Sequence, residues 1–247
     1  MSSRNAFFFP PQVFRDGFVT VTDKDVVHQI RRVLRLRVGD AFIALDGRGH
    51  ASECLIHSME KDTLRAQIVA ERTIDHEPTA AIVLYPALIR RERFALLLEK
   101  CTELGVTEFR PIIAERSAYT HLTPILLRRW EKVVREAAEV VRRGVLPAIH
   151  QAQPVAEALA GLSMQEGDRA FILSTRSEEM VLPKDLVAIC AKKPQRIHLF
   201  LGPEGDCTDA EYALFRDAGI QPLSLGSRIV RSETAAIAAV SLLAAFL

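Results

Sequence analysis

Two glycine-punctuated segments contain most of the residues whose types and spacing could do chemistry. The first is Leu201-Gly202-Pro203-Glu204-Gly205, which follows a run of apolar residues. Glycines let backbone amides and carbonyls approach a ligand closely, because they carry no Cβ. A tight turn between a strand and a helix would use the same residues, so this segment alone leaves a ligand loop and a plain turn equally open.

The second segment combines two arginines with a carboxylate just after another glycine. Residues 223–235 end an apolar run at Gly226 and continue through Arg228 and Arg231 to Glu233. A surface salt bridge, with an acid favoured by the dipole of the following helix, would explain these charges without a ligand. Two such glycine turns at neighbouring strand ends favour a pocket instead, because ligands of open α/β sheets bind beyond the carboxyl ends of the strands.

The sequence lacks the common motifs of nucleotide-binding and metal-binding sites. The glycines are not followed by Lys-Ser or Lys-Thr, and the pattern G-x-G-x-x-G is absent. The four cysteines are far apart and no histidine cluster accompanies them, which argues against a zinc site and against a disulfide framework. The net charge is only +1, so any nucleic-acid partner must bind a local basic patch. We therefore expect no metal.

The elements that must position these segments fall into two regions. Residues 1–74 combine short alternating strands, one helix over 23–34 and an Asp-Gly hairpin signal, which predicts a small β-barrel. A polar stretch that ends at Pro78 predicts a linker. Residues 79–247 alternate buried-type strands with helices, which predicts an α/β fold with a mostly parallel sheet. In that region the expected strands are 80–88, 106–113, 169–174, 196–202 and 220–225, and the expected helices are 92–104, 124–143 and 235–246, with another helix beginning at the capping box Thr208–Glu211.

The two ends of the sequence carry no membrane signal. The first residues are few and interrupted by Pro10 and Pro11, which argues against a signal peptide. The last apolar stretch, 235–247, is shorter than the ~20 residues that a membrane span needs. We therefore expect a cytoplasmic protein that binds no membrane.

Several segments resemble, in the same order, the signature segments of the RsmE family of SPOUT RNA methyltransferases. The N-terminal ones are residues 28–35 and 46–47, and the upstream ones are 99–106 and 115–117 with Pro111. The two glycine segments described above resemble the C-terminal signatures. Any one segment is a weak match, but segments in this order over nearly the whole chain form a specific pattern.

The resemblance implies a fold, a reaction and partners. The fold would be a SPOUT domain with a C-terminal trefoil knot, preceded by a PUA-like β-barrel that helps to bind RNA. The reaction would be N3-methylation of a uridine in the decoding region of 16S ribosomal RNA of the small subunit, with S-adenosyl-L-methionine as the methyl donor. The chain would act as a homodimer with the active site at the subunit interface.

Carried over residue by residue, the resemblance implies a substrate side and three cofactor loops: the first follows residues 171–174, the second is 201–205, and the third runs from 225 to 235. The expected cofactor-binding residues are Leu173, Ser174, Leu201, Gly202, Pro203, Glu204, Gly205, Leu225, Gly226, Ile229, Thr234 and Ala235. Arg116, Arg231 and Glu233 are expected to face the substrate. Glu233 is the candidate base for the uridine N3 proton, unless water or phosphate accepts it, and either arginine could stabilise charge on the uracil oxygens.

RNA affinity is expected to come from arginines that contact phosphates. The first group is Arg31, Arg32, Arg35 and Arg37, and the second is the three arginines within residues 90–93. Basic runs on helices are usually solvated faces, so that interpretation stays open. Because uridine N3 lies on the Watson–Crick edge, the target base must be unpaired or flipped out.

The sequence departs from the family pattern at two places. On the long helix, the usual Gln and small residues are replaced within 139–143, where only Glu139 and Arg143 remain. Asp206 stands in place of a second glycine. The first departure leaves open a SPOUT enzyme that acts on another rRNA nucleotide or on tRNA. A ribosome-assembly factor that binds RNA without turnover is a further alternative, against which the intact glycine loops and Arg231 argue.

Overall fold

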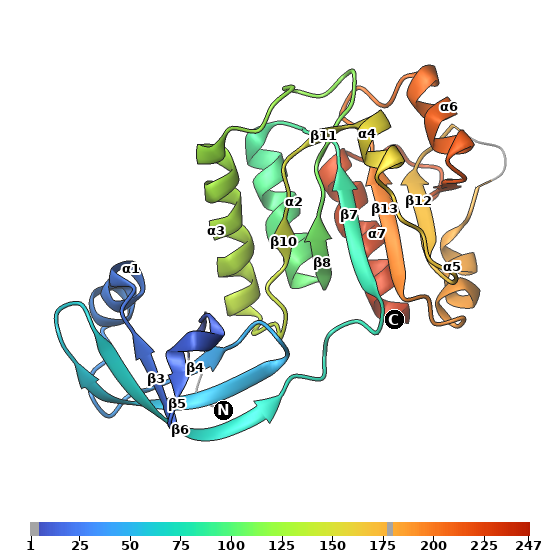
Figure 1. The fold of residues 1–247 in the computed structure, drawn as a ribbon. Helices are drawn as coiled ribbons and strands as arrows, with labels where there is room; N and C mark the ends of the chain where they lie inside the picture. Colours follow the sequence, from blue (N-terminus) through green and yellow to red (C-terminus); the bar gives the residue numbers. More distant parts are fainter. Residues whose placement is uncertain (1–4, 177–179) are drawn as a thin grey trace. The chain divides into compact units, whose positions relative to one another are not determined.

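The computed structural model describes residues 5–176 and 180–247. Contacts between Cα atoms divide the chain into two compact units, which can be followed by colour in Figure 1. The first unit comprises Met1–Glu77 with Ala138–Leu146, and the second comprises Pro78–Ala137 with Pro147–Leu247. Residues 138–146, which the sequence places in the second region, thus pack within the first unit.

The first unit is built on a six-stranded sheet in the order β1-β4-β5-β6-β3-β2. Its strands are β1 (Ala6–Phe8), β2 (Phe14–Arg15), β3 (Phe18–Val21), β4 (Ala41–Leu45), β5 (His50–Met59) and β6 (Leu64–Thr73), with a short 3-10 helix at Pro11–Val13. Neighbouring strands are antiparallel, except that β1 and β4 are parallel. Phe42 packs edge-on against Phe7 and contacts Phe9 in the core of this unit.

The helical segment of the first unit differs from the expected single helix over 23–34. The structure has α1 (Lys24–His28), which continues directly into a π-helix (Gln29–Val33). Asp23 caps α1, because its side chain accepts hydrogen bonds from two amides of the first turn. Ile30 is fully buried in the core, whereas the arginines that follow it are exposed.

Glu139 and Arg143, which remain from the family pattern on the long helix, both hold the first unit together. The Glu139 carboxylate accepts a hydrogen bond from the Phe8 amide at 2.9 Å. Arg143 Nε lies 3.2 Å from both carboxylate oxygens of Glu77, whose carboxylate also accepts from the two backbone amides that follow Arg143. Burial raises the pKa of Glu77, but the hydrogen bonds and charge of Arg143, with those amides, outweigh it, so the pKa lies below its ordinary value.

The second unit is built on a six-stranded parallel sheet in the order β10-β8-β7-β13-β12-β14. Its strands are β7 (Ala81–Pro86), β8 (Val106–Phe109), β10 (Ala148–Ile149), β12 (Arg169–Leu173), β13 (Arg196–Leu201) and β14 (Gln221–Leu223), and a separate pair joins β9 (Ile112–Ile113) to β11 (Gln153–Pro154). Its helices are α2 (Arg91–Glu103), most of α3 (Pro124–Val140), α4 (Val155–Ala160), α5 (Pro183–Cys190), α6 (Asp209–Asp217) and α7 (Ser232–Phe246). The parallel α/β sheet that the sequence predicts is confirmed.

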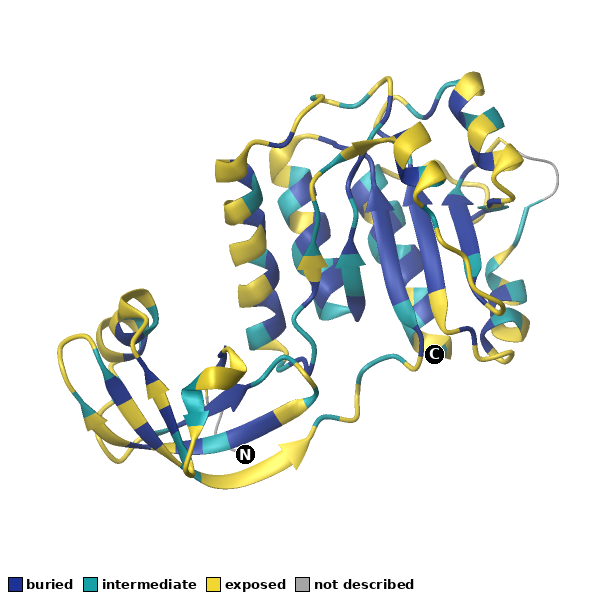
Figure 2. Cartoon of the chain, viewed as in Figure 1, coloured by how far each residue is buried: buried dark blue, intermediate teal, exposed yellow. Residues whose placement is uncertain are grey.

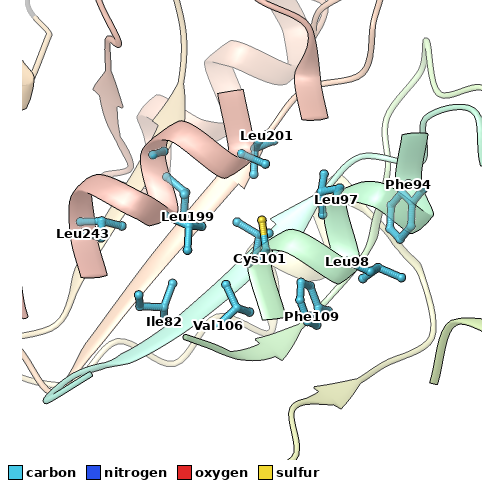
Figure 3. Packing of buried hydrophobic residues seen from close by; sticks show 14 of the residues in the cluster. Ile82, Phe94, Leu97, Leu98, Cys101, Val106, Phe109, Leu199, Leu201 and Leu243 are labelled. Atoms are coloured by element: carbon cyan, nitrogen blue, oxygen red, sulfur yellow. The ribbon is translucent and has the colours of Figure 1, made fainter. Parts of the chain in front are cut away.

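The central strands β7, β12 and β13 are buried along most of their length, and Figure 2 draws them mostly in dark blue. On one face, Ile197, Leu199 and Leu201 of β13 belong to a cluster with α2 and α7, part of which is drawn in Figure 3. On the other face, Phe200 packs edge-on against Phe215 of α6. Strands covered on both sides explain why the sequence shows near-continuous apolar runs rather than alternation.

Element limits differ from the predictions in detail. The long helix α3 ends at Val140 rather than at 143, and α7 begins at Ser232 rather than at 235. The capping box that starts α6 is confirmed, because Thr208 and Glu211 bond to each other's backbone amides. The sequence did not predict α4, α5, β1 and the two-residue strands β2, β10 and β11, and the strand expected over 106–113 is divided into β8 and β9. The trefoil knot implied by the resemblance stays a prediction.

Candidate functional site

The carboxyl ends of three neighbouring strands surround a pocket. β13, β12 and β14 lie next to one another in this order and run parallel. The loops that follow them line a pocket of about 580 Å³, which is within the ~300–1,000 Å³ of small-molecule sites. Every predicted cofactor-binding residue lines this pocket except Thr234, an exposed residue of α7. The structure therefore brings the two glycine segments together.

Ion pairs join the first and second loops of the pocket. Arg176 Nε lies 2.6 Å from Asp206 Oδ2, and Arg176 Nη1 lies 2.9 Å from Asp209 Oδ1. The Tyr212 hydroxyl donates to Asp206 Oδ1 at 2.9 Å. Burial raises the pKa of Tyr212, and this hydrogen bond to Asp206 also raises it, so the hydroxyl remains a donor at neutral pH. Asp206 has φ +62°, a conformation that glycine adopts freely, and its carboxylate adds contacts that glycine could not make.

Ser232 links the third loop to Gly202 of the second loop. Ser232 Oγ donates to the Gly202 carbonyl at 3.1 Å. A Cβ added to Gly202 would lie 3.1 Å from Cys207 Sγ, which is closer than ordinary van der Waals contact. Gly226 has φ +110°, a conformation that residues with side chains rarely adopt. Both glycines thus give the loops a path that larger residues would disturb.

Arg116, which the sequence places toward the substrate, lies against the second loop rather than in the pocket lining. Arg116 Nη1 donates to the Gly205 carbonyl at 2.9 Å. The turn that carries Arg116 is fixed because the Glu115 amide donates to Glu211 Oε1 at 2.8 Å. Arg116 therefore contacts the pocket through the backbone of the second loop.

Arg231 and Glu233 differ in exposure although they are close in sequence. Arg231 is the exposed N-cap residue of α7 and lines the pocket. Glu233 is 6% exposed and is not part of the pocket lining. Its Oε1 lies 3.8 Å from Arg93 Nε, and its Oε2 is buried without a hydrogen-bond partner among the described residues. Of these two side chains, only Arg231 borders the space where a ligand would bind.

Several pocket residues were not among those predicted from the sequence. They are Arg93, Thr175, Asp206, Tyr212, Leu223, Arg228, Val230 and Ser232. Most of them lie within or next to the predicted loops, so extending each predicted loop by one or two residues would have included them. Arg93 of α2 and Tyr212 of α6 come from other elements, and no local pattern points them at the pocket. The sequence placed Arg93 among the phosphate-contacting arginines, whereas here it pairs with Glu204 at 2.6 Å.

The first unit carries a separate basic hollow. Arg31, Arg32, Arg35 and Arg37 are all exposed and line a hollow of about 570 Å³. Arg35 has φ +56°, where the chain leaves the π-helix. Within residues 5–176 and 180–247, none of the four arginines forms an ion pair with a carboxylate. Their charges are thus open to a negatively charged partner.

The described residues contain neither a candidate membrane helix nor a candidate metal cluster. No helix among them is long and apolar enough to cross a membrane. No group of three or more His, Cys, Asp or Glu side chains among them could hold a metal ion. The four cysteines are free and buried.

Comparison with known families matches both units of the chain. The family model of the RNA methyltransferase domain matches residues 75–244. The family model of the RNA methyltransferase PUA domain matches residues 21–69. These matches agree with the predicted order of a PUA-like unit followed by a methyltransferase unit.

Relatives named ribosomal RNA small subunit methyltransferase E resemble nearly the whole chain. The protein of Synechocystis sp. is 34% identical over 239 residues, which cover 96% of this chain and 76% of the relative. The protein of Bacillus subtilis is 27% identical over 220 residues, which cover 87% of this chain and 85% of the relative.

Solved structures share the fold over the full length. The ribosomal RNA small subunit methyltransferase E of Neisseria gonorrhoeae, bound to S-adenosyl methionine, has a TM-score of 0.84 at 29% identity and covers 96% of this chain and 95% of its own. A Legionella pneumophila protein of known structure has a TM-score of 0.86 at 24% identity, covers 98% of this chain and 97% of its own, and shows the same fold. The predicted fold class is confirmed by these structures. Family matches, relatives and structures agree, and the chain belongs to the RNA methyltransferase family of the ribosomal RNA small subunit methyltransferase E proteins.

Proposed function

We propose that this chain transfers the methyl group of S-adenosylmethionine to N3 of a uridine in the decoding region of 16S ribosomal RNA. The observation that carries the proposal is the pocket at the carboxyl ends of β12, β13 and β14, which contains both glycine segments and Arg231. The name of the relatives and the cofactor of the Neisseria gonorrhoeae protein support it.

The pocket residues fit this cofactor. Leu173, Leu201 and Leu225 provide apolar walls that suit an adenine ring, and the backbone at Gly202 and Gly226 can offer amides and carbonyls to polar groups. When bound, S-adenosylmethionine supplies an electrophilic methyl group on a sulfonium. The task of the protein is then to orient the two reactants and to manage the proton of the target base.

Proton removal makes uridine N3 a nucleophile and leaves negative charge on the uracil oxygens. Arg231 borders the pocket, and we assign it the stabilisation of that charge. Water or phosphate could accept the proton, and Glu233, which lies outside the pocket lining, stays a candidate because its Oε2 has no hydrogen-bond partner among the described residues. Arg116 is the second candidate for charge stabilisation, although its Nη1 is bonded to the second loop.

A methyltransferase assay on unmodified small ribosomal subunits, with mass mapping of the product, tests the function. The expected product is 3-methyluridine in the decoding region. A methyl group on another rRNA nucleotide or on tRNA would favour the alternative substrate that the departure at 139–143 leaves open. Cofactor binding or RNA binding without any methylated product would favour the assembly factor instead.

The proposed partners are the 16S ribosomal RNA within the small subunit and a second copy of the chain. Light scattering of the purified protein measures whether two copies of the chain associate. A mass of about twice the 27.5 kDa of one chain is expected, and a strict monomer at assay concentration would contradict the dimer.

Gly226→Val should weaken S-adenosylmethionine binding by about tenfold or more. Gly226 lines the pocket at φ +110°, and holding valine in this conformation costs on the order of 1–3 kcal/mol, so the third loop should change its path. Calorimetric titration with the cofactor measures the affinity. Gly167→Val is the matched control, because Gly167 has φ +94° and open space around it but does not line the pocket. Equal affinities of the two variants would contradict the prediction.

The double variant Arg32→Glu/Arg35→Glu should weaken RNA binding and reduce its dependence on salt. Each lost phosphate contact lowers the slope of log affinity against log salt concentration by about 0.7–0.9. Fluorescence anisotropy with a decoding-region RNA, measured over a salt series, gives both quantities. Lys61→Glu/Arg72→Glu makes the same change in net charge at exposed positions outside the basic hollow. If both double variants keep the original slope, the four arginines are only a solvated surface.

A further inference from the structure

Arg93 joins the second and third loops of the pocket through charge. It lies in the first turn of α2, and its Nη1 is 2.6 Å from Glu204 Oε1 in the second loop. Its Nε is 3.8 Å from Glu233 Oε1, which lies in the first turn of α7 at the end of the third loop. One guanidinium therefore lies between two carboxylates that belong to different loops.

We propose that Arg93 is a positioning residue of the methyl-transfer site, which holds Glu204 and Glu233 so that the two loops keep the shape that binds the methyl donor. The inference rests on the proposed function, since it assigns a role within the same pocket. Nothing in the local sequence around Arg93 distinguishes it from Arg90 and Arg91. Those two arginines are exposed, whereas Arg93 is partly buried and borders the pocket.

Because the three side chains are largely buried, loss of their ion pairs should be energetically costly. The side chains of Arg93 and Glu204 are 29% and 31% exposed, and that of Glu233 is 8% exposed. A carboxylate as buried as Glu233 is unfavourable unless a cation or hydrogen-bond donors offset its lost hydration. Arg93 is its ion-pair partner in the described part of the chain, and the N-terminus of α7 adds a favourable dipole. Arg93 thus sets where this carboxylate lies.

The helices that carry these charges are held together by other contacts. Leu97 and Cys101 of α2 lie in one buried cluster with Leu243 of α7, as Figure 3 shows. The hydrogen bond from Ser232 to Gly202 is a further link between the two loops. Loss of Arg93 should therefore change the pocket more than the stability of the fold.

Calorimetric titration of the full chain with S-adenosylmethionine tests the proposal. Arg93→Met should raise the Kd by about tenfold or more. Arg93→Lys should stay within about threefold of the unchanged chain, because an ammonium group can still pair with Glu204. Arg216→Met is the matched control: it removes the same charge from a side chain that is 79% exposed on α6, and it should bind the cofactor like the unchanged chain. Thermal unfolding of each variant reports the fold separately.

A second variant shows whether Arg93 acts through Glu204. Arg93→Met/Glu204→Met should bind the cofactor within about twofold of Arg93→Met alone, because Arg93→Met already breaks the ion pair that Glu204→Met removes. Equal affinities of Arg93→Met and Arg216→Met would overturn the proposal, and so would full additivity in the double variant. If Arg93→Met does not fold, unchanged affinity in Glu204→Met overturns it. Absence of cofactor binding in the unchanged chain would overturn the proposed function, and this inference with it.

Discussion

Arg231→Ala should slow methyl transfer by about 10²–10³-fold while leaving the fold and cofactor binding largely unchanged. The Arg231 side chain is exposed, borders the pocket and has no ion-pair partner among the described residues, so its guanidinium is available to pair with the uracil oxygens of the proposed substrate. It makes no side-chain capping bond at the start of α7, so alanine removes no contact that stabilises this helix. Single-turnover assays at saturating cofactor measure the chemical step, and calorimetry measures cofactor affinity.

Two further variants separate charge from geometry at this position. Arg231→Lys keeps the positive charge but loses the planar fork of donors, so its rate should fall between those of the unchanged chain and the alanine variant. Arg216→Ala removes an exposed arginine of α6 and should leave the rate unchanged. Near-normal turnover of Arg231→Ala would end its catalytic assignment. A loss of cofactor affinity as large as the loss of rate would make Arg231 a cofactor-binding residue instead.

The pocket was predictable where its parts are contiguous in the sequence. Segments 201–205 and 225–235 each combine the end of an apolar strand, a glycine and the start of a helix, and parallel strands bring such ends to one edge of the sheet. Arg93 could not be predicted, because its place depends on how α2 packs beside α7. The burial of Glu233 depends on the same packing, since a carboxylate in the first turn of a helix is ordinarily exposed.

The order of the strands in the sheet could not be predicted from the sequence either. Apolar runs predicted the strands of the second unit, but β7 pairs with β13, and no local pattern specifies a partner so distant in the chain. The two-residue strands are too short to show any periodicity. In the sequence Asp206 is a small departure from the family's second glycine, and its left-handed backbone and its ion pair with Arg176 are seen only in the folded structure.

The departure on the long helix leaves the substrate nucleotide open, and the structure gives the two remaining family residues of that helix partners within the first unit. Glu139 accepts from the Phe8 amide, and Arg143 pairs with Glu77. Both roles need residues from distant parts of the chain, so no helical periodicity could reveal them. The contribution of the Arg143–Glu77 pair to the free energy of unfolding can be measured directly.

Glu77→Gln should lower the free energy of unfolding by about 3–5 kcal/mol at neutral pH. The Arg143 side chain is 3% exposed, and Glu77 provides the carboxylate that offsets the lost hydration of its guanidinium. Glutamine keeps the shape but not the charge, so the buried cation is left less well compensated. Urea unfolding of the variant and the unchanged chain measures the difference.

The pH dependence of that difference shows whether charge is responsible. The pKa of Glu77 lies below its ordinary value of 4.5, so its contribution to stability is fully present above that pH and is lost as the pH falls through the lower folded pKa. The gap in unfolding free energy between the unchanged chain and Glu77→Gln should therefore be largest at neutral pH and should shrink in acid. Glu77→Gln/Arg143→Met should recover part of the loss, because no buried cation remains. A gap that is constant across pH would mean that the packing of the Glu77 side chain, rather than its charge, stabilises the first unit.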